Sequence, residues 1–143
     1  MRYARVVVDT SIIVAGLRSR LGASYQVLML IADQRLVPLL TTAVFLEYED
    51  VLLRPEQRLA TGMSEKDVAG FLSAFASAAE PVEVHFRWRP QLHDADDEMI
   101  LEAAVNGGAD ALITHNVDDF RPAARNFEIP VLSPGELLQE LEK

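Results

Sequence analysis

Val6-Val7-Val8-Asp9-Thr10-Ser11 is the stretch of sequence that decides the fold. Its three valines form a short β-branched run typical of a buried strand, and the polar residues after it lie at the strand's C-terminal end. Further strands are predicted at 36–40, 82–84, 111–114 and 130–132, separated by helical patterns. This alternation predicts an α/β fold, a three-layer sandwich with a mainly parallel central sheet flanked by helices.

Helices are predicted where apolar residues recur at a spacing of three to four residues. The predicted helical ranges are 12–17, 24–32, 43–53, 64–79 and 96–106, followed by a terminal helix after residue 133. Thr41 or Thr42 and Ser64 are the expected N-caps, and Ser133-Pro134-Gly135-Glu136 is a capping box with proline at the first helical position. Pro38 predicts an edge position or a strand start, because proline has no amide hydrogen to give to a sheet.

The composition is that of one soluble domain. A chain of 143 residues that is 50% hydrophobic and 24% charged is predicted to form a single domain over residues 1–143. No apolar run approaches the roughly 20 residues that cross a bilayer, and Asp9 interrupts the first apolar run where a signal peptide would continue. We therefore expect a cytoplasmic protein without membrane contact. Since cysteine is absent, any metal must be bound by oxygen or imidazole.

The net charge of -9 argues against the broad basic surface of a protein that binds nucleic acid by neutralising phosphates. A local groove is still compatible with this charge, because arginine can bind phosphate through two parallel hydrogen bonds. The arginines near predicted loops are Arg18, Arg20, Arg54 and Arg58. The acidity also fits many carboxylates gathered in one site, or a basic partner, and the sequence leaves these explanations open.

Carboxylates from four separate segments are predicted to meet at one edge of the sheet, where parallel strands end and helices begin. They are Asp9, Glu47, the group Asp94, Asp96, Asp97 and Glu98, and the pair Asp118 and Asp119. Like charges at one place favour protonation unless a cation neutralises them. Mg²⁺ prefers oxygen ligands and keeps several waters, so such a site leaves room for a phosphate oxygen and an attacking water. The sequence therefore predicts a site for Mg²⁺, with Mn²⁺ as a substitute.

Each acidic segment also has a simpler explanation. Asp9 can cap the helix that follows it, and the run 94–98 can complement a helix dipole. The pair 118–119 fits an ordinary turn before Phe120. The three histidines have no metal-ligand spacing and are expected on the surface or in loops; they are His85, His93 and His115. Only the convergence of the acids favours a functional site.

Glu47 and Glu49 lie on opposite borders of the apolar face of their predicted helix. Helical geometry alone does not choose between them.

At these residues the chain resembles the PIN-domain family, particularly the VapC-like toxin components of bacterial and archaeal toxin–antitoxin pairs. The opening strand with Asp9, Thr10 and Ser11 is similar to the family's first motif, although many members have asparagine at the position of Ser11. Residues 46–55 resemble the second motif of one subfamily, and that alignment selects Glu47. Residues 94–104 match the third motif.

In the third motif Asp97 takes the family's catalytic position, with Asp96 as a close alternative. Residues 114–120 resemble the fourth motif, a threonine followed two residues later by aspartate or asparagine and ending in an acid and phenylalanine. Asn116 stands where many members carry an acid, so Asp119 becomes the expected fourth carboxylate. The four motifs occur in the family's order and span nearly the whole chain.

The resemblance implies a metal-dependent endoribonuclease. Asp9 and Asp97 would bind the metal, and Glu47 and Asp119 would complete the acidic site directly or through water. Ser11 and Thr114 would orient these ligands by hydrogen bonds, and Asn116 would be a neutral oxygen ligand at best. The implied partners are an RNA substrate, a cognate antitoxin whose basic or tryptophan-bearing segment blocks the groove, and a second copy of the chain in a homodimer.

Two other functions are weighed against this one. A phosphatase or phosphotransferase with Asp9 as nucleophile is disfavoured, because such enzymes need a second acid at the position of Ser11 and a lysine near the later strands. The sequence has no lysine between Lys66 and Lys143. A non-enzymatic PIN-like binding module is the second alternative, since the low positive charge and Asn116 are compatible with it.

Overall fold

The structure, a computed structural model, describes residues 4–87, 91–92 and 94–143. Within these residues five strands form one parallel sheet in the order β3-β2-β1-β4-β5. The strands are β1 (Arg5–Val8), β2 (Val37–Leu40), β3 (Glu80–Pro81), β4 (Ala111–Ile113) and β5 (Val131–Leu132). The helices are α1 (Thr10–Arg18), α2 (Ala23–Ala32), α3 (Thr42–Leu52), α4 (Pro55–Thr61), α5 (Glu65–Ala78), α6 (Ala95–Gly107), α7 (Val117–Arg125) and α8 (Pro134–Leu141).

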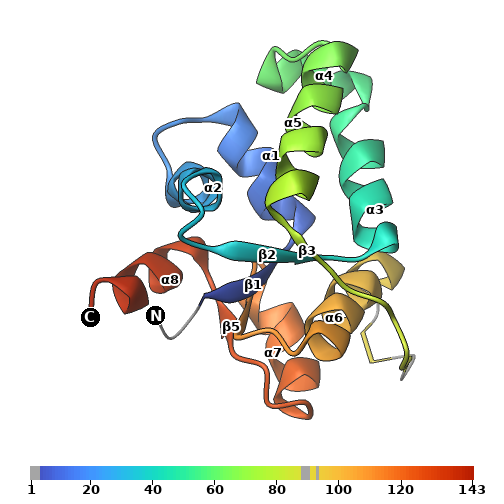
Figure 1. Cartoon of the computed structure of the whole chain (residues 1–143), viewed down its shortest axis with the longest axis vertical. Helices are drawn as coiled ribbons and strands as arrows, with labels where there is room; N and C mark the ends of the chain where they lie inside the picture. The colour runs from blue at the N-terminus through green and yellow to red at the C-terminus, as the bar shows by residue number, and fades with distance from the viewer. Residues whose placement is uncertain (1–3, 88–90, 93) are drawn as a thin grey trace.

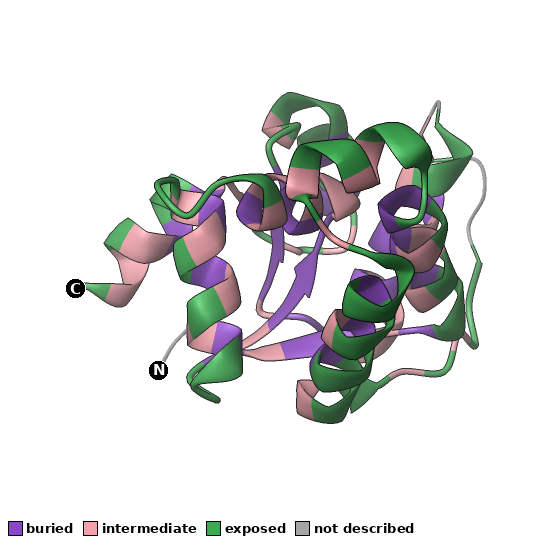
Figure 2. Ribbon diagram, turned by 90° about the horizontal axis from the view of Figure 1, so that it is seen from above, coloured by how far each residue is buried: buried purple, intermediate pink, exposed green. Residues whose placement is uncertain are grey.

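Helices cover both faces of the sheet, with α1 to α5 on one side and α6 to α8 on the other (Figure 1). The predicted three-layer α/β sandwich is therefore confirmed. The strands form the buried centre and the helices turn their exposed faces outward (Figure 2). Among the described residues, no helix combines the length and the apolar character required to cross a membrane.

The first strand lies at the centre of the sheet, between β2 and β4. Val6, Val7 and Val8 are fully buried. Because helices cover the strand on both faces, its apolar residues are continuous rather than alternating. Val8 pairs with Ile113 of β4, and the Asp9 amide donates to the Ile113 carbonyl at 2.9 Å. Asp9 is thus held where two adjacent strands end.

Pro38 lies in an interior strand, so the edge explanation is wrong and the strand-start explanation applies. The Val37 amide donates to Ala4 on the β1 side, which turns the Pro38 nitrogen toward β3. β3 pairs only with Leu39 and Leu40, so the missing amide hydrogen of Pro38 removes no bond from the sheet.

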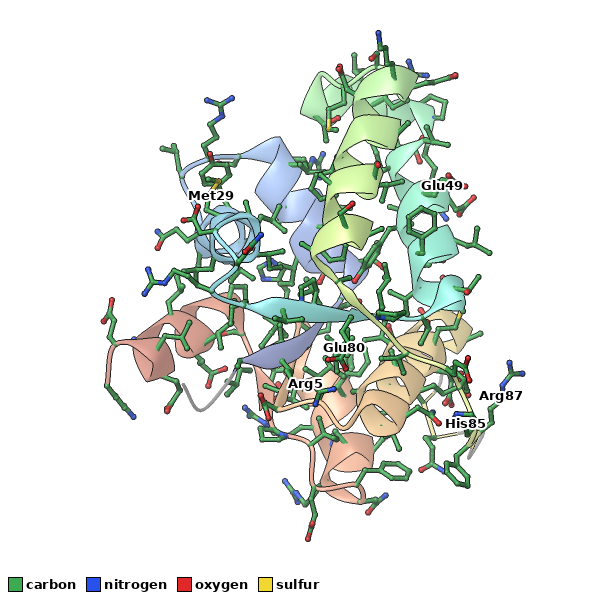
Figure 3. The ribbon with its side chains drawn as sticks, viewed as in Figure 1. Arg5, Met29, Glu49, Glu80, His85 and Arg87 are labelled. Atoms are coloured by element: carbon green, nitrogen blue, oxygen red, sulfur yellow. The ribbon has the colours of Figure 1, made fainter. Side chains whose placement is uncertain are left out.

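The strand predicted at 82–84 is wrong by two residues, because β3 is Glu80–Pro81. Arg5 pairs with Glu80 beside the sheet (Figure 3) and also donates to the Gly107 carbonyl. Beyond the strand, the side-chain oxygen of Asn106 accepts hydrogen bonds from the amides of His85 and Phe86, each at 2.9 Å. These contacts draw the chain from the sheet onto α6.

The predicted caps are confirmed, with Thr41 as the N-cap of α3 and capping boxes at Ser64 and Ser133. Two helices are additions to the prediction. Pro55 begins α4 at its first helical position, and the positive φ of 73° at Gly62 follows its end. The turn predicted for residues 118–119 is wrong, because both acids lie in the first turn of α7, where they complement the helix dipole.

Candidate active site

An open pocket of about 420 Å³ lies at the C-terminal edge of the sheet, where β1 ends. Acids from three segments line it; they are Asp9, Glu47, Asp94, Asp96 and Asp97. Asn116, which follows β4, also lines the pocket. The parallel sheet thus brings together residues that lie far apart in the sequence.

Asp9 is 5% exposed, and its orientation is fixed by two hydroxyl groups. Its Oδ2 accepts hydrogen bonds from Thr114 Oγ1 at 2.7 Å and from Ser11 Oγ at 3.0 Å. The Thr114 hydroxyl in turn accepts from the Asn116 amide at 2.9 Å. Asp9 has the N-cap position of α1, but its side chain makes no capping hydrogen bond, so helix capping does not explain this carboxylate. No described residue donates to its Oδ1.

Glu47 lines the pocket, whereas Glu49 lines a separate groove between α3 and α5 (Figure 3). Tyr48, the residue between them, fixes this rotation of α3. Its buried hydroxyl donates to the Val8 carbonyl, and its ring packs edge-on against Phe75 with the ring centres 5.5 Å apart. Burial raises the pKa of Glu47, and the charges of the neighbouring acids, Asp96 first, raise it further.

The acids at the start of α6 differ in their contacts. Asp94 lines the pocket and also caps the helix by accepting from the Asp96 amide at 2.9 Å, so it has a structural role at the helix start. Glu98 is buried and accepts from the Leu92 amide at 2.7 Å, which anchors the preceding loop outside the pocket. Asp97 is half-buried in the pocket without a hydrogen bond or an ion pair to any described residue.

The pKa of Asp97 is raised to about 6 from 3.8. Burial is the largest cause, followed by the negative charges of Asp9, Asp94, Asp119 and Asp96. Asp96, the alternative catalytic acid, also lines the pocket but is exposed. Burial and four neighbouring negative charges therefore all disfavour the ionised form of Asp97.

Asp119 does not line this pocket. It lines an adjoining one of about 450 Å³ together with Asp94, Asp97 and Asp118. Asp97 lines both pockets, and the negative charge of Asp119 is one of the charges that raise its pKa. Asn116 lies in the pocket itself and makes no side-chain cap to α7.

The donors of the pocket are carboxylate and amide oxygens, which are the ligands that Mg²⁺ and Mn²⁺ prefer. In the described parts of the chain, no three acids or histidines stand close enough together to form a ready metal site. His85 is exposed and pairs with Glu83 at 3.6 Å, and His115 bonds to Ser24 at 3.0 Å. His93 lies outside the described residues. The fit to a divalent cation therefore rests on the chemistry of the donors and on the raised pKa of Asp97.

Two residues of the pocket are not predicted from the sequence as site residues. Arg18, at the end of α1, is predicted only as one of four arginines near loops, and no sequence motif indicates Gln57. Gln57 lies on α4, a helix that apolar periodicity did not predict. Its proline at the first helical position was the available signal.

A family model described as PIN domain matches residues 5–118. Searches of curated proteins and of solved structures found no match. The matched range contains Asp9, Glu47 and Asp97 and ends one residue before Asp119. PIN domains are generally nucleases and generally use divalent metal ions. Since the model covers most of the chain and the observed sheet and acidic pocket agree with it, this protein belongs to the PIN-domain family.

Proposed function

We propose that this protein is an endoribonuclease that hydrolyses RNA phosphodiester bonds with Mg²⁺ or Mn²⁺. The observation that carries the proposal is that Asp9, Glu47 and Asp97, from three distant segments, line one pocket at the C-terminal edge of the sheet. The raised pKa of Asp97 is further support, because burial and then the negative charges of its neighbours disfavour the ionised form of that carboxyl. Nuclease activity is the general property of the family, and RNA is the substrate we assign.

Asp9 and Asp97 would hold the cation. The hydroxyls of Thr114 and Ser11 occupy one oxygen of Asp9 and leave the other free to bind. A divalent cation held there would lower the pKa of water and offset negative charge on the phosphate. Glu47, whose pKa is raised by burial, is suited to accept a proton from the attacking water. Asp119, in the adjoining pocket, would act on this site through its negative charge, which raises the pKa of Asp97.

Activity is tested by incubating single-stranded RNA with the purified protein in Mg²⁺, in Mn²⁺ and in a chelator. Glu47→Gln should lower the cleavage rate by about 100-fold or more, since it removes a proton acceptor from the pocket. Glu49→Gln is the matched control, because it makes the same change on the same helix outside the pocket. Asp9→Asn should abolish cleavage.

Each alternative function has its own result in this assay. Intact RNA after incubation with the unmutated protein, or equal cleavage by the Glu47→Gln and Glu49→Gln variants, would refute the ribonuclease proposal. Phosphate released from a small phosphomonoester, without cleavage of RNA, would favour the phosphatase. RNA binding without cleavage would favour the binding module.

We also propose that the protein is the toxin of a toxin–antitoxin pair. The net charge of -9 and the open acidic pocket suit a basic segment of an antitoxin. Expression in a bacterial host should arrest growth, and the Asp9→Asn variant should not. A small neighbouring gene for a protein with a basic tail should relieve the arrest when it is co-expressed. Normal growth with the unmutated chain at a verified level of protein would contradict the toxin role.

A further inference from the structure

Two residues that line the acidic pocket are hydrogen-bond donors instead of acids, and they come from the contacting helices α1 and α4. Arg18, at the C-terminal end of α1, and Gln57, on α4, line the same pocket as Asp9 and Glu47. The apolar side chain of Val14 lies on the same helix as Arg18 and lines the pocket too. The pocket therefore combines its acids with two donor residues on α1 and α4, which we call the donor side.

Arg18 is an available cation. Its side chain is exposed and forms no ion pair with any described residue, whereas Arg5, Arg54 and Arg58 are each paired with an acid. Arg18 lies nine residues after Asp9 along α1, which corresponds to roughly 13 Å at 1.5 Å per residue. This separation suits two different phosphates of one strand, rather than a single phosphate shared by both residues.

Gln57 contributes an amide without a partner. Its Oε1 is enclosed and accepts no hydrogen bond, and no described residue bonds to its Nε2. The enclosed Oε1 is an acceptor and cannot bind a phosphate, so the Nε2 amide is the donor that Gln57 offers to a ligand. The second polar group of the donor side thus also lacks a protein partner.

We propose that Arg18 and Gln57 form a subsite for a second phosphodiester of the RNA strand, farther along it than the one that is cleaved at Asp9. This inference rests on the proposed ribonuclease function. The guanidinium group would bind the phosphate through two parallel hydrogen bonds, and the Gln57 amide would donate to the same nucleotide. The subsite gives a protein of net charge -9 a local means of holding a polyanion. A substrate with only one phosphodiester would not bind Arg18, so the rate of its cleavage should not depend on that residue.

The test compares Arg18→Gln with Arg20→Gln in the Mn²⁺-loaded protein. Arg20 is the matched control, since it is an exposed arginine near the same helix end that does not line the pocket. On a single-stranded RNA oligomer, Arg18→Gln should lower kcat/KM about tenfold, mainly through KM. On bis(p-nitrophenyl) phosphate, which has one phosphodiester, the rate should stay within about twofold. Gln57→Met should also lower kcat/KM on RNA, by less than Arg18→Gln does. Its rate on bis(p-nitrophenyl) phosphate should likewise stay within about twofold.

Binding provides a readout that does not depend on catalysis. In an Asp9→Asn background, Arg18→Gln should weaken the affinity for a fluorescent RNA oligomer and reduce the slope of log affinity against log salt by about 0.7, the value for one phosphate contact. Thermal unfolding of every variant checks that the fold is intact.

The outcomes separate this inference from the ribonuclease proposal. Equal behaviour of the Arg18 and Arg20 variants on RNA, or an equal loss by Arg18→Gln on both substrates, would overturn the subsite. If the unmutated protein cuts no RNA, the ribonuclease proposal fails, and the affinity for the fluorescent RNA oligomer then tests the subsite on its own. A weaker affinity with a smaller salt slope then supports it, and unchanged binding overturns it.

Discussion

Replacing Asp97 by asparagine should stabilise the cation-free protein at neutral pH. In the folded protein the pKa of Asp97 is about 6, against an ordinary value of 3.8. Below about pH 3.8 the carboxyl is protonated in both the folded and the unfolded chain and does not affect stability. As the pH rises toward about 6, the unfolded chain loses this proton first, so folding becomes less favourable. Above about pH 6 the whole penalty is present.

The magnitude follows from the two pKa values. The difference between 3.8 and about 6 corresponds to about 3 kcal/mol at 1.36 kcal/mol per pKa unit. Because Asp97 is only half-buried, solvent screening reduces the expected gain to roughly 1 kcal/mol. For a domain of this size, such a gain raises Tm by roughly 3 °C.

The assay is urea unfolding at pH 7.5 and at pH 4 in a chelator, with Asp33→Asn as the control. Asp33 is an exposed acid at the end of α2, so this variant makes the same change of charge away from the pocket. Asp97→Asn should gain stability over the control at pH 7.5 and lose most of that gain at pH 4. Added Mg²⁺ should stabilise the unmutated protein more than the variant. An equal gain at both pH values, or no gain at pH 7.5, would refute the electrostatic reasoning.

Two further variants test the supports of the site. Tyr48→Phe should lower the free energy of unfolding by roughly 1 kcal/mol, because the buried Val8 carbonyl loses its donor, as urea unfolding would show. Thr114→Val should weaken metal binding by about tenfold or more, because Asp9 loses the shorter of its two hydroxyl contacts. Titration with Mn²⁺ measures this affinity, and Thr114→Ser, which retains the hydroxyl, should bind Mn²⁺ nearly as well as the unmutated protein.

The central part of the fold was predictable because its cause is local. A β-branched run that is buried on both faces needs no polar alternation, so Val6-Val7-Val8 indicates an interior parallel strand directly. Once the strands are parallel, their C-terminal ends share one edge, and Asp9 is placed there by topology alone. The same reasoning places Asp97 near it, because this residue lies in the first turn of α6, whereas Glu47 reaches the pocket from the middle of α3.

The remaining differences arise from contacts between distant residues. Glu80 in β3 pairs with Arg5, and farther along the chain Asn106 binds the amides of His85 and Phe86. Neither contact leaves a pattern in the strand itself. The choice of Glu47 over Glu49 depends on the rotation of α3, which Tyr48 sets through a bond to β1. Helical periodicity gives the borders of an apolar face but not which border meets the pocket.

The acids of this chain differ in what they do for the fold, and that difference identifies the functional one. Asp94 caps α6, and Glu98 anchors the loop before that helix, so each stabilises its surroundings. Asp67 completes a capping box, which lowers its pKa. Asp97 bonds to no described residue, is half-buried among four like charges, and opposes folding at neutral pH. Asp97 lies in the first turn of α6, where a negative charge complements the helix dipole, but burial and repulsion outweigh that effect and raise its pKa. A bound cation would turn the same repulsion into affinity. The unfavourable charge at Asp97 is therefore physical support for the cation site proposed above.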